Sequence, residues 1–281
     1  MDRINIRKRN DDLERMSKFP RSDFNIQRLV DNSFKAINEG AYETKDSFSS
    51  HNAMSIKTAI LSCAHVPLIT EIKFASPSQG TIRNKTDPTE IATTMVNAGA
   101  TALSILTQPY LFHGSIGNLA AIRKKVNVPL LMKDIMVSRV QIDAAKKIGA
   151  DSILLIKTVF DRNLAEESME NMTEYATRRG LQALIEVHTE DEFLEVMKSK
   201  QDLIGINNRN LDTMQLDITN TERLLSKHGK GKSVIISESG IATPEDIRYL
   251  RRAGADGFLV GTSIMDSKDI GAKVKELCNA Q

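Results

Sequence analysis

The sequence lacks several features that would place it in whole classes of protein. Its first ten residues, Met-Asp-Arg-Ile-Asn-Ile-Arg-Lys-Arg-Asn, contain no apolar core of the kind found in a signal peptide. No apolar stretch approaches the roughly 18–20 residues that cross a bilayer. The formal charge is only +2, so an anionic ligand would need a local group of side chains rather than a generally basic surface. We therefore expect neither a membrane nor a nucleic acid as partner.

Cysteine and histidine are also scarce. Cys63 and Cys278 lie far apart in the sequence, and neither belongs to a Cys-x-x-Cys pair or to a metal-ligand spacing. This pattern indicates a reduced, cytoplasmic protein without a bound metal. His188 has no second histidine nearby, so we interpret it as a supporting or surface group rather than a metal ligand.

The first quarter of the chain differs from the rest. Residues 1–23 mix both signs of charge with few apolar side chains, which predicts a solvated arm or a surface helix. Apolar residues then recur at helical spacing from Ile26, and Gly40 follows as a helix C-cap. We predict that residues 1–66 form an N-terminal helical extension that docks on a main domain, residues 67–281.

A repeating pattern of short apolar runs and amphipathic stretches begins at Leu68. Three helix-to-strand junctions have the same form, with Gly99, Gly149 and Gly254 as C-caps. Eight strands alternating with helices over about 210 residues favour an α/β fold, a closed (β/α)₈ TIM barrel. A doubly wound open sheet is the alternative, but no Gly-x-Gly-x-x-Gly motif follows the first strand. The predicted strands are Leu68–Ile72, Ala102–Leu106, Pro129–Met132, Ser152–Ile156, Gln182–Val187, Leu203–Ile206, Val234–Ser237 and Gly257–Val260.

Ionisable residues gather where these predicted strands end, which is where barrel enzymes place their catalytic groups. Glu71 and Lys73 lie two residues apart and therefore share one face of their strand. Alone, they could equally form an ion pair in the barrel wall or part of a site. Charges at the ends of five of the eight strands favour a site over scattered surface loops. The other charged strand ends are Lys133-Asp134, Glu186-Val187-His188, Asn207-Asn208-Arg209 and Ser237-Glu238.

Small residues follow the last two strands. The segments Ser239-Gly240 and Gly261-Thr262-Ser263 place backbone amides where a short helix could begin, which is the usual phosphate cradle of a barrel. Glycine lets the backbone approach an anion closely. Either glycine could simply make a turn, but their occurrence in consecutive units favours a phosphate site.

Lys133 and Glu186 are candidates for a general acid and a general base. Burial or neighbouring cations can lower the pKa of a lysine until it donates a proton near neutral pH, and we expect this of Lys133. Asp134 is a weak candidate for an ion-pair partner, because adjacent residues in a strand face opposite ways. These residues do not assemble into a nucleophilic triad.

Six segments occur in an order and spacing that is highly specific. They are Glu71-Ile-Lys73-Phe-Ala-Ser-Pro-Ser, Leu106-Thr…Phe112-His-Gly-Ser, Leu131-Met-Lys133-Asp134, Leu184-Ile-Glu186-Val, Gly205-Ile-Asn207-Asn-Arg209-Asn-Leu and Ser237-Glu238-Ser239-Gly240-Ile. Together they resemble indole-3-glycerol phosphate synthase over about Pro67 to Met265. The first 66 residues match this family weakly.

The resemblance implies a lyase of tryptophan biosynthesis that uses no metal or organic cofactor. Such an enzyme closes an indole ring on 1-(o-carboxyphenylamino)-1-deoxyribulose 5-phosphate and releases CO₂ and water. By motif position, Lys133 would protonate the ketose oxygen, and Glu186 would be the base for proton removal and dehydration. Lys73 would hold the substrate carboxylate and share acid duty, while Glu71 and Asn207 would position the reacting centre. The resemblance also implies a polar shell of Arg209 and Glu238, a phosphate cradle of Ser239, Gly240, Gly261, Thr262 and Ser76, and a ring pocket of Pro77, Phe112, Leu154 and Leu211.

The chain departs from the family pattern at three places. Ile135 stands where the family usually has Phe, which removes an aromatic wall from the ring pocket. Thr262 replaces a commoner serine or small residue, and Lys157 follows a strand that is often wholly apolar. These departures bear on substrate fit more than on reaction type.

Two other functions are compatible with the fold. A related phosphosugar isomerase would normally use an Asp/Cys or paired-carboxylate set, which the pairing of Lys133 with Glu186 does not match. A catalytically silent barrel that binds a phosphometabolite would not need an acid–base pair. We therefore expect a small phosphosugar–anthranilate substrate, and a monomer or weak homo-oligomer.

Overall fold

Eight parallel strands close into a barrel. The computed structural model describes residues 25–48, 51–76, 80–83, 86–199 and 201–280, and the predicted arm of residues 1–23 lies outside these ranges. The strand order around the barrel is β1-β10-β9-β8-β7-β6-β5-β4, so each strand lies beside its neighbour in the sequence and the last closes on the first. The predicted (β/α)₈ barrel is confirmed. The strands are β1 (Leu68–Ile72), β4 (Ala102–Leu106), β5 (Leu130–Lys133), β6 (Ser152–Ile156), β7 (Gln182–Val187), β8 (Leu203–Asn207), β9 (Val234–Glu238) and β10 (Gly257–Val260).

Five of these strands match the predicted bounds residue for residue, and the other three end one residue later; β5 also begins one residue later, at Leu130. The additional residues are Lys133, Asn207 and Glu238. Each is polar, so an apolar run stops before it, but the parallel ladder continues: Lys133 is in register with Leu106, and Asn207 with Glu238. These three side chains are therefore fixed by strand backbone rather than by loops.

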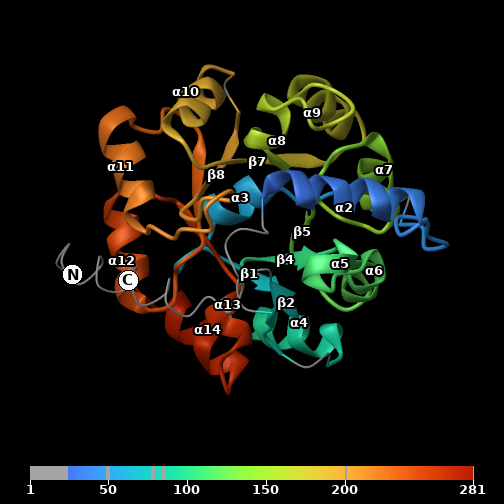
Figure 1. Cartoon of the computed structure of the whole chain (residues 1–281). Helices are drawn as coiled ribbons and strands as arrows, with labels where there is room; N and C mark the ends of the chain where they lie inside the picture. The colour runs from blue at the N-terminus through green and yellow to red at the C-terminus, as the bar shows by residue number, and fades with distance from the viewer. Residues whose placement is uncertain (1–24, 49–50, 77–79, 84–85, 200, 281) are drawn as a thin grey trace.

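Helices surround the barrel and complete the α/β alternation (Figure 1). Each of the three predicted junctions has its glycine at positive φ, with 110° at Gly99, 79° at Gly149 and 109° at Gly254. A side chain is strained in that region, which explains glycine at these C-caps. The outer helices are α4 (Pro88–Asn97), α6 (Ile116–Arg123), α7 (Arg139–Lys147), α9 (Met169–Arg178), α10 (Glu190–Lys198), α11 (Thr219–His228), α12 (Pro244–Arg252) and α14 (Ile270–Cys278).

Shorter elements lie in the loops that follow the strands. The antiparallel pair β2 (Ala75–Ser76) and β3 (Gly80–Thr81) follows β1. Three short helices, α5 (Pro109–Phe112), α8 (Lys157–Asp161) and α13 (Thr262–Met265), follow β4, β6 and β10. These loops therefore project from the carboxyl ends of the strands, the end of the barrel that carries active sites.

Two helices before the barrel pack on its opposite ends. Leu29 of α2 (Ile26–Asn38) lines the cavity at the carboxyl ends of the strands, and α2 lies across the barrel in Figure 1. By contrast, α3 (Ile56–Leu61) binds the amino ends: the Ile56 amide donates to Gln182 Oε1 at 3.0 Å. The Ile60 side chain lies against Gly257, the first residue of β10.

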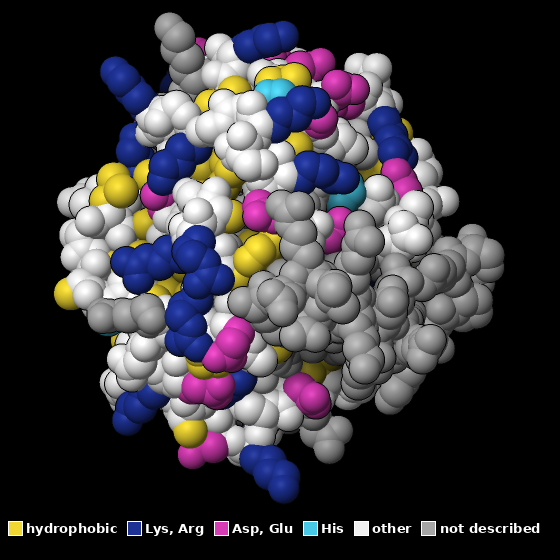
Figure 2. All heavy atoms as spheres, turned by 90° about the vertical axis from the view of Figure 1, so that its left-hand side faces the viewer, with side chains coloured by type: hydrophobic (Ala, Val, Ile, Leu, Met, Phe, Trp, Pro, Cys, Tyr) yellow, Lys and Arg dark blue, Asp and Glu magenta, His cyan; other side chains and the backbone are white. Residues whose placement is uncertain are grey.

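The surface is polar. The face in Figure 2 carries acidic and basic side chains of both signs, with hydrophobic side chains in small separate groups between them. Leu61 and Val140 are the large exposed hydrophobic side chains within the described residues. None of the described helices is both long enough and apolar enough to span a bilayer.

Candidate active site

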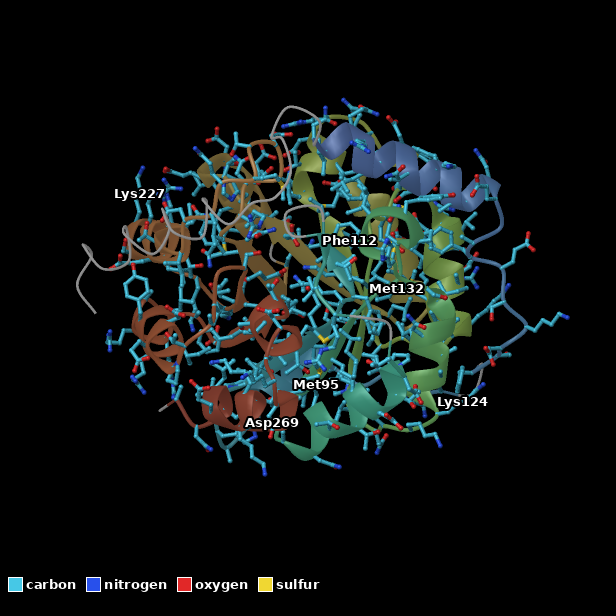
Figure 3. All side chains as sticks on the ribbon, turned by 60° about the horizontal axis from the view of Figure 1, so that its bottom comes forward. Met95, Phe112, Lys124, Met132, Lys227 and Asp269 are labelled. Carbon is cyan, nitrogen blue, oxygen red and sulfur yellow. The ribbon has the colours of Figure 1, made fainter. Side chains whose placement is uncertain are left out.

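A cavity of about 310 Å³ opens at the carboxyl ends of the barrel strands. Figure 3 places Phe112 and Met132 near the middle of the molecule, whereas Lys124 and Lys227 lie at its rim. The cavity wall contains every predicted site residue whose side chain the structure describes. They are Glu71, Lys73, Phe112, Lys133, Leu154, Glu186, Asn207, Arg209, Leu211, Glu238, Ser239, Gly240, Gly261 and Thr262. Of the other two, Ser76 contributes backbone to β2, and Pro77 lies outside the described residues.

A lysine held by carboxylates occupies the floor of this cavity. Lys133 Nζ donates to Glu186 Oε2 at 3.0 Å and to Glu238 Oε2 at 2.5 Å. Asn207 Nδ2 donates to the other oxygen of Glu186 at 2.8 Å. Four polar side chains from β5, β7, β8 and β9 thus form one hydrogen-bonded group, which alternation along each strand directs into the barrel.

A second ion pair lies beside it on β1. Lys73 Nζ is 2.9 Å from Glu71 Oε1, so the two residues do pair, and they also line the cavity. Burial alone would raise the pKa of Glu71, but Lys73 and Lys133 outweigh it and hold that pKa below its usual value. The ion pair that the sequence left open is therefore present, and it lies in the wall of the cavity.

The prediction that the pKa of Lys133 is lowered is wrong. Burial does favour the neutral amine, but Glu186, Glu238 and Glu71 together outweigh it and raise the pKa above the ordinary lysine value. The charge on Lys133 is therefore strongly retained. Asp134 is not among the causes of this shift, and its carboxylate instead accepts hydrogen bonds from Tyr42 and Thr107.

Glu238 differs from the other carboxylates of the cavity. Burial, with the nearby charges of Glu186 and Glu71, raises its pKa to about 7 in spite of the opposing effect of Lys133. Its Oε1 is buried and makes no hydrogen bond within the described part of the chain. An unpaired buried oxygen is costly, and such atoms occur where a ligand or a proton completes the bonding.

Gly205 on β8 makes room for that oxygen. A Cβ atom at position 205 would lie 2.1 Å from Glu238 Oε1, far inside van der Waals contact. Gly261 has a similar use, since a Cβ there would lie 2.7 Å from Glu71 Oε1. These two glycines thus leave space for carboxylates rather than making turns.

The turn after β9 lines the cavity. Ser239 and Gly240 both have positive φ, 69° and 79°, and consecutive residues of this kind make a concave nest of amides that suits an anion. Asn208 Nδ2 holds the turn by donating to the Ser239 carbonyl at 3.1 Å. The turn after β10 is tied to it by Ser263 Oγ, which donates to the Ile241 carbonyl at 2.9 Å.

One cation of the cavity is available for a ligand anion. Arg209 Nη1 donates to the Met214 carbonyl at 2.9 Å, and Arg209 forms no ion pair within the described residues. Burial lowers the pKa of Arg209 from its usual value, and nothing offsets this. A half-buried guanidinium that has no counter-ion among the described residues favours binding of a carboxylate or phosphate.

Comparison with known proteins identifies the family. The sequence profile described as indole-3-glycerol phosphate synthase matches residues 26–277. The chain belongs to the indole-3-glycerol phosphate synthase family. It is 43% identical over 212 residues to an indole-3-glycerol phosphate synthase of Methanocaldococcus jannaschii, covering 75% of this chain and 77% of that one. It is 41% identical over 205 residues to the Bacillus cereus protein of that name (73% and 79%), and 40% identical over 211 residues to that of Caldanaerobacter subterraneus (75% and 79%).

Solved structures confirm the architecture alone. A thiamine phosphate pyrophosphorylase from Pyrococcus furiosus superposes with a TM-score of 0.56 at 17% identity, covering 80% of this chain and 97% of that one. At this identity the likeness shows a shared barrel and nothing about chemistry. The family assignment rests on the sequence comparisons.

Several residues of this synthase-family cavity could not be found by sequence reasoning. Leu29 belongs to a helix whose apolar face was visible in the sequence, but nothing in the sequence said that this face covers the cavity. Gln108 lies two residues after the end of β4 and was not predicted as a site residue. Its Nε2 is buried and has no hydrogen-bond partner among the described residues. Other residues of the wall that were not predicted to belong to the site are Leu106, Asp134, Ile156, Met214, Leu216, Ile241, Ala242, Leu259, Val260 and Asp266.

Proposed function

We propose that this protein catalyses the reaction of the indole-3-glycerol phosphate synthase family, with the residues of the cavity in the roles given below. It closes the indole ring of 1-(o-carboxyphenylamino)-1-deoxyribulose 5-phosphate with loss of CO₂ and water, in tryptophan biosynthesis. The observation that supports the roles is Lys133 in contact with both Glu186 and Glu238 at the floor of a cavity. Residues 1–66 act as an extension, and residues 67–281 as the catalytic barrel.

Lys133 is the general acid for ring closure. As the new carbon–carbon bond forms, charge develops on the ketose oxygen, and its basicity rises well above that of the ketone. A lysine whose pKa is raised by three carboxylates protonates such an alkoxide readily, while it stays charged and polarises the carbonyl beforehand. The raised pKa therefore suits an acid that acts late rather than one that acts at the start.

Glu186 is the base that removes the ring proton in the later dehydration. Its two oxygens are held by Asn207 Nδ2 and Lys133 Nζ, which fixes the direction in which the carboxylate faces the substrate. A proton accepted by Glu186 lies within hydrogen-bond distance of Lys133, so the acid can be recharged by the base within one turnover.

The anionic ends of the substrate bind at opposite sides of the cavity. The amides of Ser239, Gly240, Gly261 and Thr262 receive the phosphate, with Ser76 nearby. Lys73 holds the anthranilate carboxylate, and Arg209 lies in the polar shell. Lys73 is already paired with Glu71 at 2.9 Å, so it binds the substrate carboxylate only moderately. Moderate binding is suitable because a strongly stabilised carboxylate would be harder to lose as CO₂.

An apolar half of the cavity accepts the aromatic ring. Phe112, Leu154, Leu211 and Ile135 line it, and Pro77 completes it in our proposal. Ile135 provides a branched aliphatic wall where the family usually has an aromatic one, which suits the edge of a flat ring.

The protein acts on this small phosphorylated substrate without a cofactor or a nucleic acid partner, in the cytoplasm, as a monomer or weak homo-oligomer. A fluorescence assay tests the function directly, since the indole product is fluorescent. Purified protein given the carboxyphenylamino-deoxyribulose phosphate forms the product equally well before and after EDTA treatment. Absence of product under both conditions would refute the enzyme and favour a silent phosphometabolite-binding barrel.

A further inference from the structure

A second, smaller cavity of about 60 Å³ reaches Glu186 from another side. Glu186 lines both this cavity and the main one, and its residue is only 4% exposed. The far wall of the small cavity includes Arg162 and Thr189, which are exposed. The small cavity thus leads from the surface to the proposed base without passing through the substrate-binding cavity.

Its wall combines the apolar side chains of Ile156, Val187 and Leu211 with polar side chains that are firmly held. Glu192 of α10 accepts from the amides of His188 and Thr189 at 2.8 Å and 3.0 Å, and from the Thr158 hydroxyl. Arg162 and Asp212 form an ion pair at the surface end. These polar groups give water its hydrogen-bond partners, and the volume suffices for roughly four to six molecules at about 10–15 Å³ each.

His188 contributes a ring nitrogen to this space. Its Nδ1 is 2.8 Å from the Asn207 carbonyl, and because a carbonyl can only accept, Nδ1 carries the hydrogen. Nε2 makes no hydrogen bond to the described residues, and it is the atom left to bond with cavity water. His188 is separated from Glu186 by one residue, and both side chains line the same cavity.

The reaction proposed above needs a proton from solvent in every turnover. The ketose oxygen takes up two protons before it leaves as water, and the methylene carbon gives up one as it becomes the ring CH. The electron pair of the breaking carbon–carboxylate bond stays in the ring when CO₂ leaves. The balance is one proton consumed per substrate, and the bound substrate fills the main cavity through which bulk water would otherwise supply it.

We propose that the small cavity is a water-filled proton route to Glu186, with His188 as the residue that positions its innermost water. Lys133 gives two protons to the substrate oxygen. Glu186 first passes on a proton that arrives from solvent through the small cavity, which recharges Lys133 before the dehydration, and then returns a second one, taken from the substrate carbon as water leaves. The route rests on the proposed function, because it serves only a reaction that consumes a proton.

Two substitutions test the route, after wild-type protein has been shown to form the indole product. His188→Asn removes Nε2, and Thr158→Val removes a hydroxyl from the wall with little change in shape. In each, kcat falls about tenfold with KM within about twofold, since proton supply and not binding is impaired. The solvent deuterium isotope effect on kcat rises, and added imidazole restores the rate of His188→Asn, which a merely structural defect would not allow.

The matched control is His228→Asn, a histidine that bonds Glu190 on the outer face of the barrel and leaves the kinetics unchanged. Wild-type kcat and isotope effect in both cavity variants would overturn the route while leaving the proposed function intact. If His188→Asn fails to fold, Thr158→Val decides alone. If the wild type forms no product, the proposed function itself has failed.

Discussion

Each end of the barrel buries a carboxylate, and the two carboxylates differ in how many hydrogen bonds their oxygens accept. At the amino end, Asp151 is fully buried, and each of its oxygens accepts two hydrogen bonds, from His51, Arg123 and two backbone amides, over 2.6–3.0 Å. At the carboxyl end, Glu238 is 1% exposed and bonds Lys133 through one oxygen, while the other oxygen has no partner among the residues that the structure describes. A carboxylate whose oxygens are all occupied by hydrogen bonds holds neighbouring segments of the fold together. One that has an oxygen without a hydrogen bond can still bind a ligand or exchange a proton.

The largest effect is expected from the lysine at the carboxyl end. Lys133→Met removes the general acid, and kcat falls by at least about a hundredfold, in the range lost with a single acid–base group. Stopped-flow fluorescence of product formation measures this, with circular dichroism to check the fold. Lys230→Met is the control at the amino end, where the lysine pairs with Asp256; there kcat is unchanged. An equal fall in kcat in the two variants would contradict the view that only the carboxyl end of the barrel is catalytic.

The amino end is expected to respond in stability instead. Asp151→Asn leaves the buried Arg123 guanidinium without its counter-ion, at a cost of about 3–5 kcal/mol in the free energy of unfolding. Urea denaturation measures this, and kcat per folded molecule stays at the wild-type value. Asp202→Asn serves as the comparison, because that side chain is 71% exposed and pairs with Lys57, so about 1 kcal/mol or less is lost. A fall in kcat for Asp151→Asn would contradict a purely structural role.

A methyl group added at the floor of the cavity tests whether activity depends on the position of Glu238. Gly205→Ala places Cβ 2.1 Å from the free oxygen of Glu238, so the carboxylate must move and Lys133 with it. We expect kcat to fall about tenfold, as displaced catalytic groups do, with KM little affected. Gly271→Ala in α14 is the control, since a Cβ there meets its nearest atom, of Thr94, at an ordinary 3.4 Å. An active Gly205→Ala enzyme would mean that the position of Glu238 is unimportant.

The last prediction is a pH dependence of stability. The pKa of Glu238 rises from 4.5 to about 7 in the folded protein. Between these values the folded chain keeps a proton that the unfolded chain has released, so this contribution to stability falls as the pH rises and is gone above about pH 7. Glu238→Gln abolishes it, and the stability of the wild type relative to that variant drops by up to about 1.4 kcal/mol per pH unit across the window. Urea midpoints at pH 5 and pH 7.5 test this; parallel curves for the two proteins would contradict it.

The sequence was sufficient for the barrel because its signals are local. A strand buried on both faces is a short apolar run, and a glycine C-cap announces the end of the preceding helix. Apart from the start of β5, the strand bounds that were wrong are the polar carboxyl ends at Lys133, Asn207 and Glu238. There hydrophobicity stops before the backbone ladder does, so an apolar pattern could not show that these residues still belong to strands.

The site was less accessible from the sequence, because its properties depend on groups that only folding brings together. The direction of the Lys133 pKa shift is set by carboxylates from three other strands, and a prediction from burial alone had the wrong sign. The free oxygen of Glu238 and the space left by Gly205 depend on contacts between neighbouring strands in three dimensions. The motif order identified which residues meet, but not how their charges balance.

The segment that precedes the barrel has a consequence for how the protein is made. Tyr42 bonds Asp134, His51 bonds Asp151, and Lys57 bonds Asp202, which are partners 92, 100 and 145 residues further along the chain. Residues 25–66 are synthesised before these partners, so the apolar faces of this segment have no barrel to pack against at first. Such distant contacts form slowly, and waiting segments are prone to misassembly. We expect residues 25–66, although they are synthesised before the barrel, to be among the last parts of the chain to reach their native positions.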